Sequence, residues 1–165
     1  MTYLLDANVF IEAKRRLYYG FELCPGYWQW LVDANAAGIV YSIERVADEI
    51  SIGNDELVDW VRDRGDAFFL GPDDNVLTSL RLISTWATSD DYTQAAVTKF
   101  LGDADSYLVA HAHAYGHIVV TLETTANSPG NVKIPDACTA VGVDCIDHFE
   151  MLRREGVRFV LDTSS

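Results

Sequence analysis

Residues 103–123, DADSYLVAHAHAYGHIVVTLE, carry the pattern from which the fold of this protein can be predicted. Apolar residues at helical spacing indicate a helix over 104–115, for which Asp103 is the expected N-cap. Gly116 is expected to end that helix, since glycine readily adopts the left-handed conformation found there. Residues 118–121, Ile-Val-Val-Thr, then read as a strand that is covered on both faces, as in a parallel sheet between helices.

The same alternation of short apolar runs and helical patterns extends over the rest of the chain. The expected strands cover residues 2–5, 39–41, 67–70, 118–121, 144–146 and 157–161. The expected helices cover residues 7–17, 26–37, 43–52 (with Ser42 as N-cap), 54–64, 74–87, 92–100, 104–115, 135–142 and 149–154. This order predicts an α/β protein with a mostly parallel central sheet between two helix layers. No repeat or linker interrupts it, so we expect a single domain over residues 1–165.

The charge balance argues against a broad surface for nucleic acids. The chain has 25 acidic and 12 basic residues, a net charge of −13, whereas nucleic-acid-binding proteins usually present basic patches. A phosphate contact would therefore have to be local, and the cluster Lys14, Arg15 and Arg16 is the candidate for RNA binding. The alternative is that these three side chains are solvated charges of a helix. Aromatic residues between Tyr18 and Trp30 follow them, either as a dimer interface or as part of the core.

The sequence also favours a cytoplasmic location. No stretch approaches the roughly 20 continuous apolar residues of a membrane span, so no membrane association is expected. The N-terminal segment lacks the basic region and the cleavage site of a signal peptide. Three cysteines without CxxC spacing are typical of reduced thiols.

Four acidic residues from separate segments are expected to meet at the carboxyl edge of the sheet. Asp6 directly follows the first strand, and Glu123 comes shortly after the apolar run of residues 118–120. Glu49 lies between apolar residues of the helix after the second strand, and Asp105 lies in the first turn of its helix. Ligands of open α/β sheets bind at this edge. Each acid also has an alternative interpretation as an ordinary loop, cap or surface residue.

Clustered carboxylates repel one another, and a divalent cation such as Mg²⁺, which prefers oxygen ligands, is their natural partner. Two such ions could hold a phosphodiester and activate a water molecule. Asn8 and Thr121 are expected to support the site by orienting the neighbouring carboxylates, and Asp103 to play an outer role beside its capping.

The chain resembles the PIN-domain ribonucleases in three motifs. The opening Leu-Leu-Asp-Ala-Asn-Val-Phe over residues 4–10 is similar to their apolar strand followed by Asp-x-Asn. Residues 46–50, Val-Ala-Asp-Glu-Ile, match their middle acidic helix, and residues 105–123 match the helix and strand of their second half. Residues 134–138 and 144–146 resemble a PIN subgroup of poorly assigned function.

The resemblance implies a three-layer α/β/α fold and an endoribonuclease that depends on Mg²⁺ or Mn²⁺. It carries the catalytic and metal-binding roles to Asp6, Glu49, Asp105 and Glu123. Many prokaryotic relatives are VapC-like toxins, which implies a homodimer, an RNA substrate and an antitoxin protein as partner. Two features depart from the family pattern: the last acid is Glu123 where many relatives have Asp, and the chain is strongly acidic.

Three other interpretations remain open. A PIN-like module that binds a partner protein through its acidic pocket, with little or no catalysis, is the main alternative. The haloacid-dehalogenase phosphatases also begin with a strand that ends in Asp, but here the second acidic position is Asn8. His111 and His113 have a zinc-like His-x-His spacing, yet residues two apart on a helix point away from each other.

Overall fold

The computed structural model describes residues 1–17 and 19–163, and five strands in these residues form one parallel sheet in the order β3-β2-β1-β4-β5. The strands are β1 (Tyr3–Leu5), β2 (Val40–Ile43), β3 (Phe69–Leu70), β4 (Ile118–Val120) and β5 (Cys145–Ile146). The strand β1 lies at the centre, with Leu5 opposite Val120 of β4 and Leu4 opposite Tyr41 of β2.

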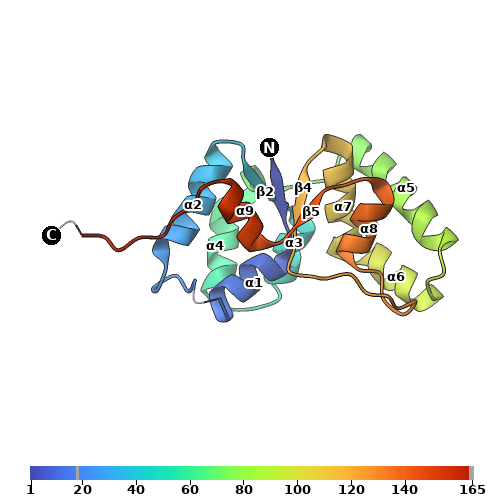
Figure 1. Cartoon of the computed structure of the whole chain (residues 1–165), viewed down its shortest axis with the longest axis horizontal. Helices are drawn as coiled ribbons and strands as arrows, with labels where there is room; N and C mark the ends of the chain where they lie inside the picture. The colour runs from blue at the N-terminus through green and yellow to red at the C-terminus, as the bar shows by residue number, and fades with distance from the viewer. Residues whose placement is uncertain (18, 164–165) are drawn as a thin grey trace.

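Helices cover both faces of this sheet. They are α1 (Ala7–Arg15), α2 (Pro25–Ala36), α3 (Glu44–Ile50), α4 (Glu56–Arg64), α5 (Asp74–Ser89), α6 (Gln94–Gly102), α7 (Ala104–Tyr115), α8 (Ile134–Val141) and α9 (His148–Arg154), with a 3-10 turn, η1 (Gly65–Ala67). In Figure 1, α1, α2, α4 and α9 lie on one side of the strands, and α5, α6, α7 and α8 lie on the other. The predicted α/β/α sandwich with a parallel central sheet is therefore confirmed.

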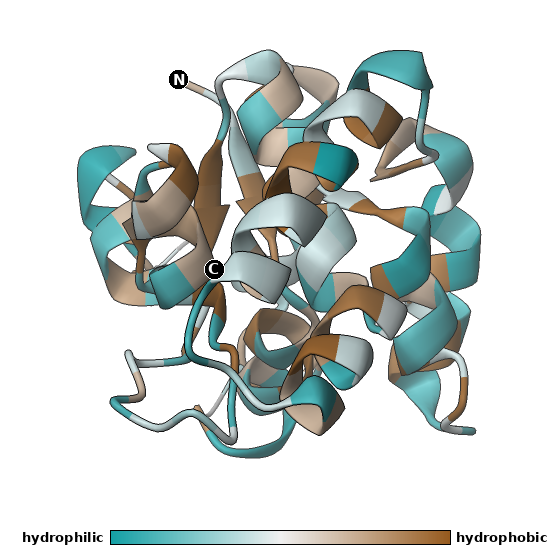
Figure 2. Cartoon of the chain, turned by 90° about the vertical axis from the view of Figure 1, so that its right-hand side faces the viewer, coloured by the Kyte–Doolittle hydropathy of each residue, from teal (hydrophilic) through white to brown (hydrophobic). Residues whose placement is uncertain are grey.

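The core is formed where the strands meet these helices. Every residue of β1 and β4 is buried, because each strand is covered on both faces. Figure 2 shows the strands coloured mainly as hydrophobic and enclosed by helices of mixed character. On α7, Leu108 and Val109 are completely buried, and Gly116 ends the helix with a φ of 69°. Among the described residues, no helix is both long and apolar enough to cross a membrane.

One predicted helix cap, Ser42, is wrong, and another, Asp103, is right in position but makes no capping bond. Ser42 lies inside β2, and its buried hydroxyl donates to the carbonyl oxygen of Leu5 at 2.6 Å, so it joins two strands instead of capping α3. Asp103 does occupy the N-cap position of α7, but its side chain makes no capping bond. Its carboxylate instead pairs with Lys99 of α6, with 2.9 Å between Oδ2 and Nζ.

The predicted last strand is also wrong. Residues 157–163 form no strand and, in Figure 1, leave the body of the protein beside α2. The ring of Phe159 packs against Tyr19 and Tyr27, which draws this segment toward the aromatic side chains and away from the sheet. Val160 and Leu161 are exposed.

The aromatic segment belongs to the core for the most part. Tyr27 and Trp28 are buried, and their rings contact Tyr19, Phe21 and Trp60 of the same chain. Tyr18, also named in the sequence analysis, lies outside the described residues. These packed rings favour the core interpretation of the segment, and the homodimer remains a prediction.

We expect Leu108→Ala to lower the free energy of unfolding by about 2–5 kcal/mol, since it leaves a cavity under the helix that carries Asp105. Urea unfolding followed by circular dichroism measures the change. The matched control is Leu82→Ala on α5, whose side chain is 48% exposed and whose truncation should change stability by only about 0.5 kcal/mol. Equal effects of the two variants would contradict the packing described here.

Candidate functional site

An open cavity of about 780 Å³ lies at the carboxyl edge of the sheet. Strand order reverses between β1 and β4, because the chain first builds outward through β2 and β3 and then returns to the other side of β1. Ligands of open α/β sheets bind in the crevice at such a reversal. We call this the acidic cavity, and its polar lining includes Asp6, Asn8, Glu49, Asp103, Asp105 and Glu123.

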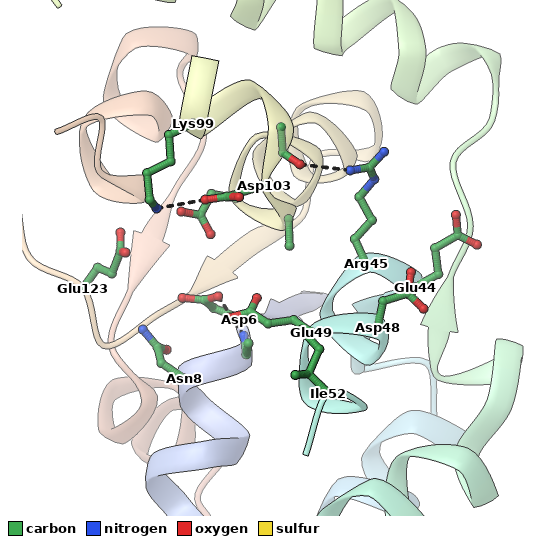
Figure 3. A pocket seen from close by; sticks show the side chains of 14 residues that line it. Asp6, Asn8, Glu44, Arg45, Asp48, Glu49, Ile52, Lys99, Asp103 and Glu123 are labelled. Carbon is green, nitrogen blue, oxygen red and sulfur yellow. Dashed lines mark hydrogen bonds and ion pairs between the residues drawn. The ribbon is translucent and has the colours of Figure 1, made fainter. Parts of the chain in front are cut away.

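All four acids predicted from the sequence line this one cavity. Asp6 follows β1 and Glu123 follows β4, whereas Glu49 comes from α3 and Asp105 from the first turn of α7. Figure 3 shows Asp6 at the floor, with Glu49 and Glu123 reaching the same space from different elements. The structure therefore brings together carboxylates that lie as far apart in sequence as Asp6 and Glu123.

Hydrogen bonds hold Asp6 in a fixed orientation although it is only 5% exposed. One carboxylate oxygen accepts from the Ala7 amide at 2.7 Å, as the N-cap of α1, and the other accepts from the Thr121 hydroxyl at 2.7 Å. The Thr121 hydroxyl oxygen in turn accepts from the Asn8 amide group and from the backbone amide of Glu123. Asn8 thus acts on Asp6 through Thr121, and Thr121 orients Asp6 more directly than it orients the Glu123 carboxylate.

The Glu123 carboxylate is anchored at the wall of the acidic cavity. One oxygen accepts from the backbone amide of Ile134, at the start of α8, at 2.9 Å. The other lies 3.8 Å from the Nζ atom of Lys133. The side chain of Glu123, one methylene longer than Asp, reaches across the loop from β4 to α8 and is held there.

Burial and mutual repulsion raise the pKa values of the acids. The pKa of Asp6 is raised to about 7, first by burial and then by the charge of Asp105, although the Thr121 hydrogen bond opposes the shift. The pKa of Asp105 is raised to about 6 by burial and by the charges of Glu123 and Glu49. Burial, followed by the charge of Asp103, also raises the pKa of Glu49. The site therefore favours anything that neutralises negative charge.

The donor atoms fit a hard divalent cation, because carboxylate oxygens are the ligands that Mg²⁺ and Mn²⁺ prefer. In the conformation of the described residues, however, no three His, Cys, Asp or Glu side chains lie close enough together to hold a metal ion. Glu123 is engaged by Ile134 and Lys133, and Asp103 by Lys99, so both carboxylates have partners of their own. Cation binding would require the carboxylates to draw together.

Basic residues beside the cavity were not identified from the sequence. Arg45 and Lys99 line it. The guanidinium of Arg45 lies 3.8 Å from the ring centre of Tyr107 and donates a hydrogen bond to the Gly102 carbonyl oxygen. Lys99 lies across the cavity from Asp6 in Figure 3. Arg45 lies on α3, the helix that also supplies Glu49, and Lys99 lies on α6, which leads directly into Asp105. This closeness in sequence to the predicted acids is the only signal by which the two basic residues could have been identified.

The basic cluster predicted to bind RNA does not line the acidic cavity. Lys14 and Arg15 both pair with Asp55, at 3.0 and 3.4 Å, and Arg16 pairs with Glu12 of its own helix. Their role in RNA binding remains a prediction.

The two histidines of the His-x-His motif have separate surroundings. His111 is buried, and His113 shares a hydrogen bond with Ser79 through its Nδ1 atom. This placement agrees with the prediction that they point apart on the helix.

Comparisons with known proteins place these features in context. Residues 3–159 match the family model described as "Domain of unknown function (DUF4411)". No curated protein matches the sequence. The chain is similar in structure to FitAcB from Neisseria gonorrhoeae, with a TM-score of 0.54 and 20% sequence identity over 88% of this chain and 96% of that chain. At this identity the likeness shows the fold alone, which is PIN-like.

The raised pKa of Asp6 has a consequence for stability. The folded state binds the proton of Asp6 more tightly than the unfolded state, because the pKa is about 7 in the former and 3.8 in the latter. The contribution of Asp6 to the free energy of unfolding therefore falls as the pH rises through that range. His111 and His148 act in the opposite direction, because burial lowers the pKa of each to about 4. The wild type and a variant at Asp6 both contain these histidines, so the difference between their free energies of unfolding does not include the histidine contribution.

We therefore expect Asp6→Asn to gain stability relative to the wild type by about 2 kcal/mol as the pH rises from 5 to 8 in EDTA. Thermal and urea unfolding at four pH values measure the difference. Asp63→Asn, the same substitution at an exposed position on α4, is the control for the substitution itself. Parallel pH curves for Asp6→Asn and the wild type would refute the raised pKa.

Proposed function

The chain belongs to the DUF4411 family, and because that family's description assigns no activity, we propose one from the acidic cavity: hydrolysis of RNA phosphodiester bonds by a metal-dependent endoribonuclease. The observation that carries the proposal is the arrangement of Asp6, Glu49, Asp105 and Glu123 around one open cavity at the reversal point of the sheet. Perturbed pKa values in a cleft are typical of functional sites. The PIN-like fold and the motifs that resemble the PIN-domain ribonucleases support the same assignment.

The four carboxylates would hold Mg²⁺ or Mn²⁺, and the ion would supply charge neutralisation at the phosphate and activation of a water molecule. The chain's own contribution is orientation. Thr121 and the Ala7 amide orient Asp6, whereas the Ile134 amide holds Glu123 at the cavity wall, from which it would turn to reach a cation. An oriented Asp6 lowers the entropic cost of assembling the reacting groups.

Hydrolysis then adds water across one P–O bond of the strand. The attacking oxygen joins the phosphorus, the bond to the leaving ribose oxygen breaks, one proton of the attacking water passes to solvent, and the leaving oxygen takes up a proton from solvent. The openness of the cavity suits a polymer that must pass across the site.

A second candidate is a module that binds a partner protein, as an antitoxin binds its toxin in the VapC-like proteins that the sequence motifs resemble. The excess of negative charge favours it: Glu44 and Asp48 also line the acidic cavity, whereas Arg45 and Lys99 are its basic lining residues. An arginine or lysine from a partner would neutralise the raised-pKa carboxylates as a cation would. Catalysis and partner binding are compatible, so the test concerns whether turnover occurs at all.

We expect the wild-type protein to cleave a mixed pool of structured and single-stranded RNA in the presence of Mg²⁺ or Mn²⁺, and to leave it intact in EDTA. Asp105→Asn should reduce the cleavage rate by at least about 100-fold, because the variant removes a carboxylate while the fold persists. Asp63→Asn, with the same substitution outside the cavity, should retain the wild-type rate. Denaturing gels with end-labelled RNA measure the rates.

The same variants separate the two candidates. If folded wild-type protein cuts no RNA with either ion, the nuclease proposal fails and the partner-binding module replaces it. If Asp105→Asn cuts as fast as the wild type, the activity belongs to another site or to a contaminant.

Metal binding can be tested without turnover. Millimolar Mg²⁺ should raise the melting temperature of the wild type at pH 7.5 by several degrees, since a ligand that binds only the folded state stabilises it. The shift should be much smaller for Asp105→Asn and unchanged for Asp63→Asn. Equal shifts for all three proteins would show that the ion acts outside the acidic cavity.

A further inference from the structure

Two lysines flank a small niche that opens beside the acidic cavity. The niche has a volume of about 40 Å³, and its lining includes Lys99 of α6, Lys133 at the start of α8, and Asn131 of the loop between β4 and α8. It shares Asp105 and Glu123 with the acidic cavity, so the two spaces are neighbours along the same wall. We call it the lysine niche.

This placement is unusual for so acidic a chain. Two of its three lysines, Lys99 and Lys133, lie at the niche, whereas the third, Lys14, pairs with Asp55 elsewhere. A net charge of −13 repels a nucleic acid, so a strand can approach only where positive charge is concentrated. Lysine binds phosphate as a compact point charge.

Both ammonium groups are available for a ligand. The side chain of Lys99 is 75% exposed and lies 2.9 Å from Asp103, while that of Lys133 is 35% exposed and lies 3.8 Å from Glu123. The Lys99 pair is exposed and the Lys133 pair is long, so both are weak and exchanging a carboxylate for a phosphate costs little. Carboxylates that turn toward a divalent cation would release both lysines at the same time.

We propose that Lys99 and Lys133 bind a phosphodiester group of the RNA strand in the lysine niche. This group is the neighbour along the strand of the phosphodiester that the acidic cavity cleaves. The inference rests on the nuclease proposed above. The two lysines are positioning residues: they set the register of the strand across the acids and do not contact the reacting atoms. Substrate binding would then depend on an internal phosphodiester, and a terminal phosphate would not be required.

The test measures binding, not turnover, in Ca²⁺, with gels to verify that the RNA stays intact. The probe is a fluorescent single-stranded RNA with a 5′-hydroxyl end, titrated by anisotropy at several salt concentrations. Lys99→Gln and Lys133→Gln should each weaken binding by about 3- to 10-fold. Each should also reduce the magnitude of the slope of the logarithm of the association constant against log[salt] by about 0.7, the value expected for one phosphate contact on a single strand. Lys99→Arg, which keeps the charge, should restore most of the affinity.

Two control variants identify the origin of any loss. Arg62→Gln removes an exposed charge on α4, and Arg81→Gln removes an exposed charge on α5; neither residue lines the niche or the cavity. Both should bind like the wild type, and all variants are first shown to be folded by circular dichroism. Equal affinities for the wild type, Lys99→Gln and Lys133→Gln would overturn the proposal, as would a loss in Arg62→Gln as large as in the niche variants.

The outcome separates this inference from the nuclease proposal. Lysine-dependent binding by a protein that cuts nothing in Mg²⁺ would sustain the niche and remove the nuclease. Cleavage by the wild type with niche variants that bind and cut equally well would sustain the nuclease and remove the niche.

Discussion

Asp6 is a carboxylate at the end of the central strand, 5% exposed, with Asp105 and Glu123 as its charged neighbours. Burying an unpaired charge costs several kcal/mol, and the cost shows here as a raised pKa. The Thr121 hydroxyl and the Ala7 amide offset part of it. The adjacent polar groups hold this arrangement in place. The side-chain amide of Asn8 donates to the Thr121 hydroxyl oxygen, and the backbone amides of Leu122 and Glu123 donate to Asn8 and Thr121.

Acidic and basic residues alternate around this centre. Acids form most of the polar lining of the acidic cavity, where repulsion prepares them for a cation, and the basic residues Arg45, Lys99 and Lys133 lie among or beside them. A chain with a net charge of −13 can therefore bind an anionic polymer only through a narrow, local contact. The distribution of charge is more informative about function than its sum, which by itself would have excluded nucleic acid.

The local sequence predicted most helices and strands correctly, but it predicted the contacts of individual side chains less well. The helix 104–115 and its end at Gly116 match α7, because periodicity and a glycine with positive φ are local properties. Ser42 and Asp103 were expected to cap helices, yet the first bonds to Leu5 and the second to Lys99. Residues 157–161 were expected to form a strand, yet Phe159 packs on aromatic rings from the N-terminal half of the chain. For Ser42 and for residues 157–161, a contact distant in sequence outweighed a local preference, whereas Asp103 pairs within an i,i+4 contact to Lys99.

The amino-acid sequence alone determined the α/β class, the parallel sheet and the four acids, because alternating patterns and carboxylates at strand ends are readable residue by residue. Only the tertiary structure decided what surrounds those acids. The order β3-β2-β1-β4-β5 makes Asp6 and Glu123 neighbours, and helix packing brings Lys99 and Lys133 to the same niche. Side-chain electrostatics depend on distances across the fold, and no spacing along the chain records those distances.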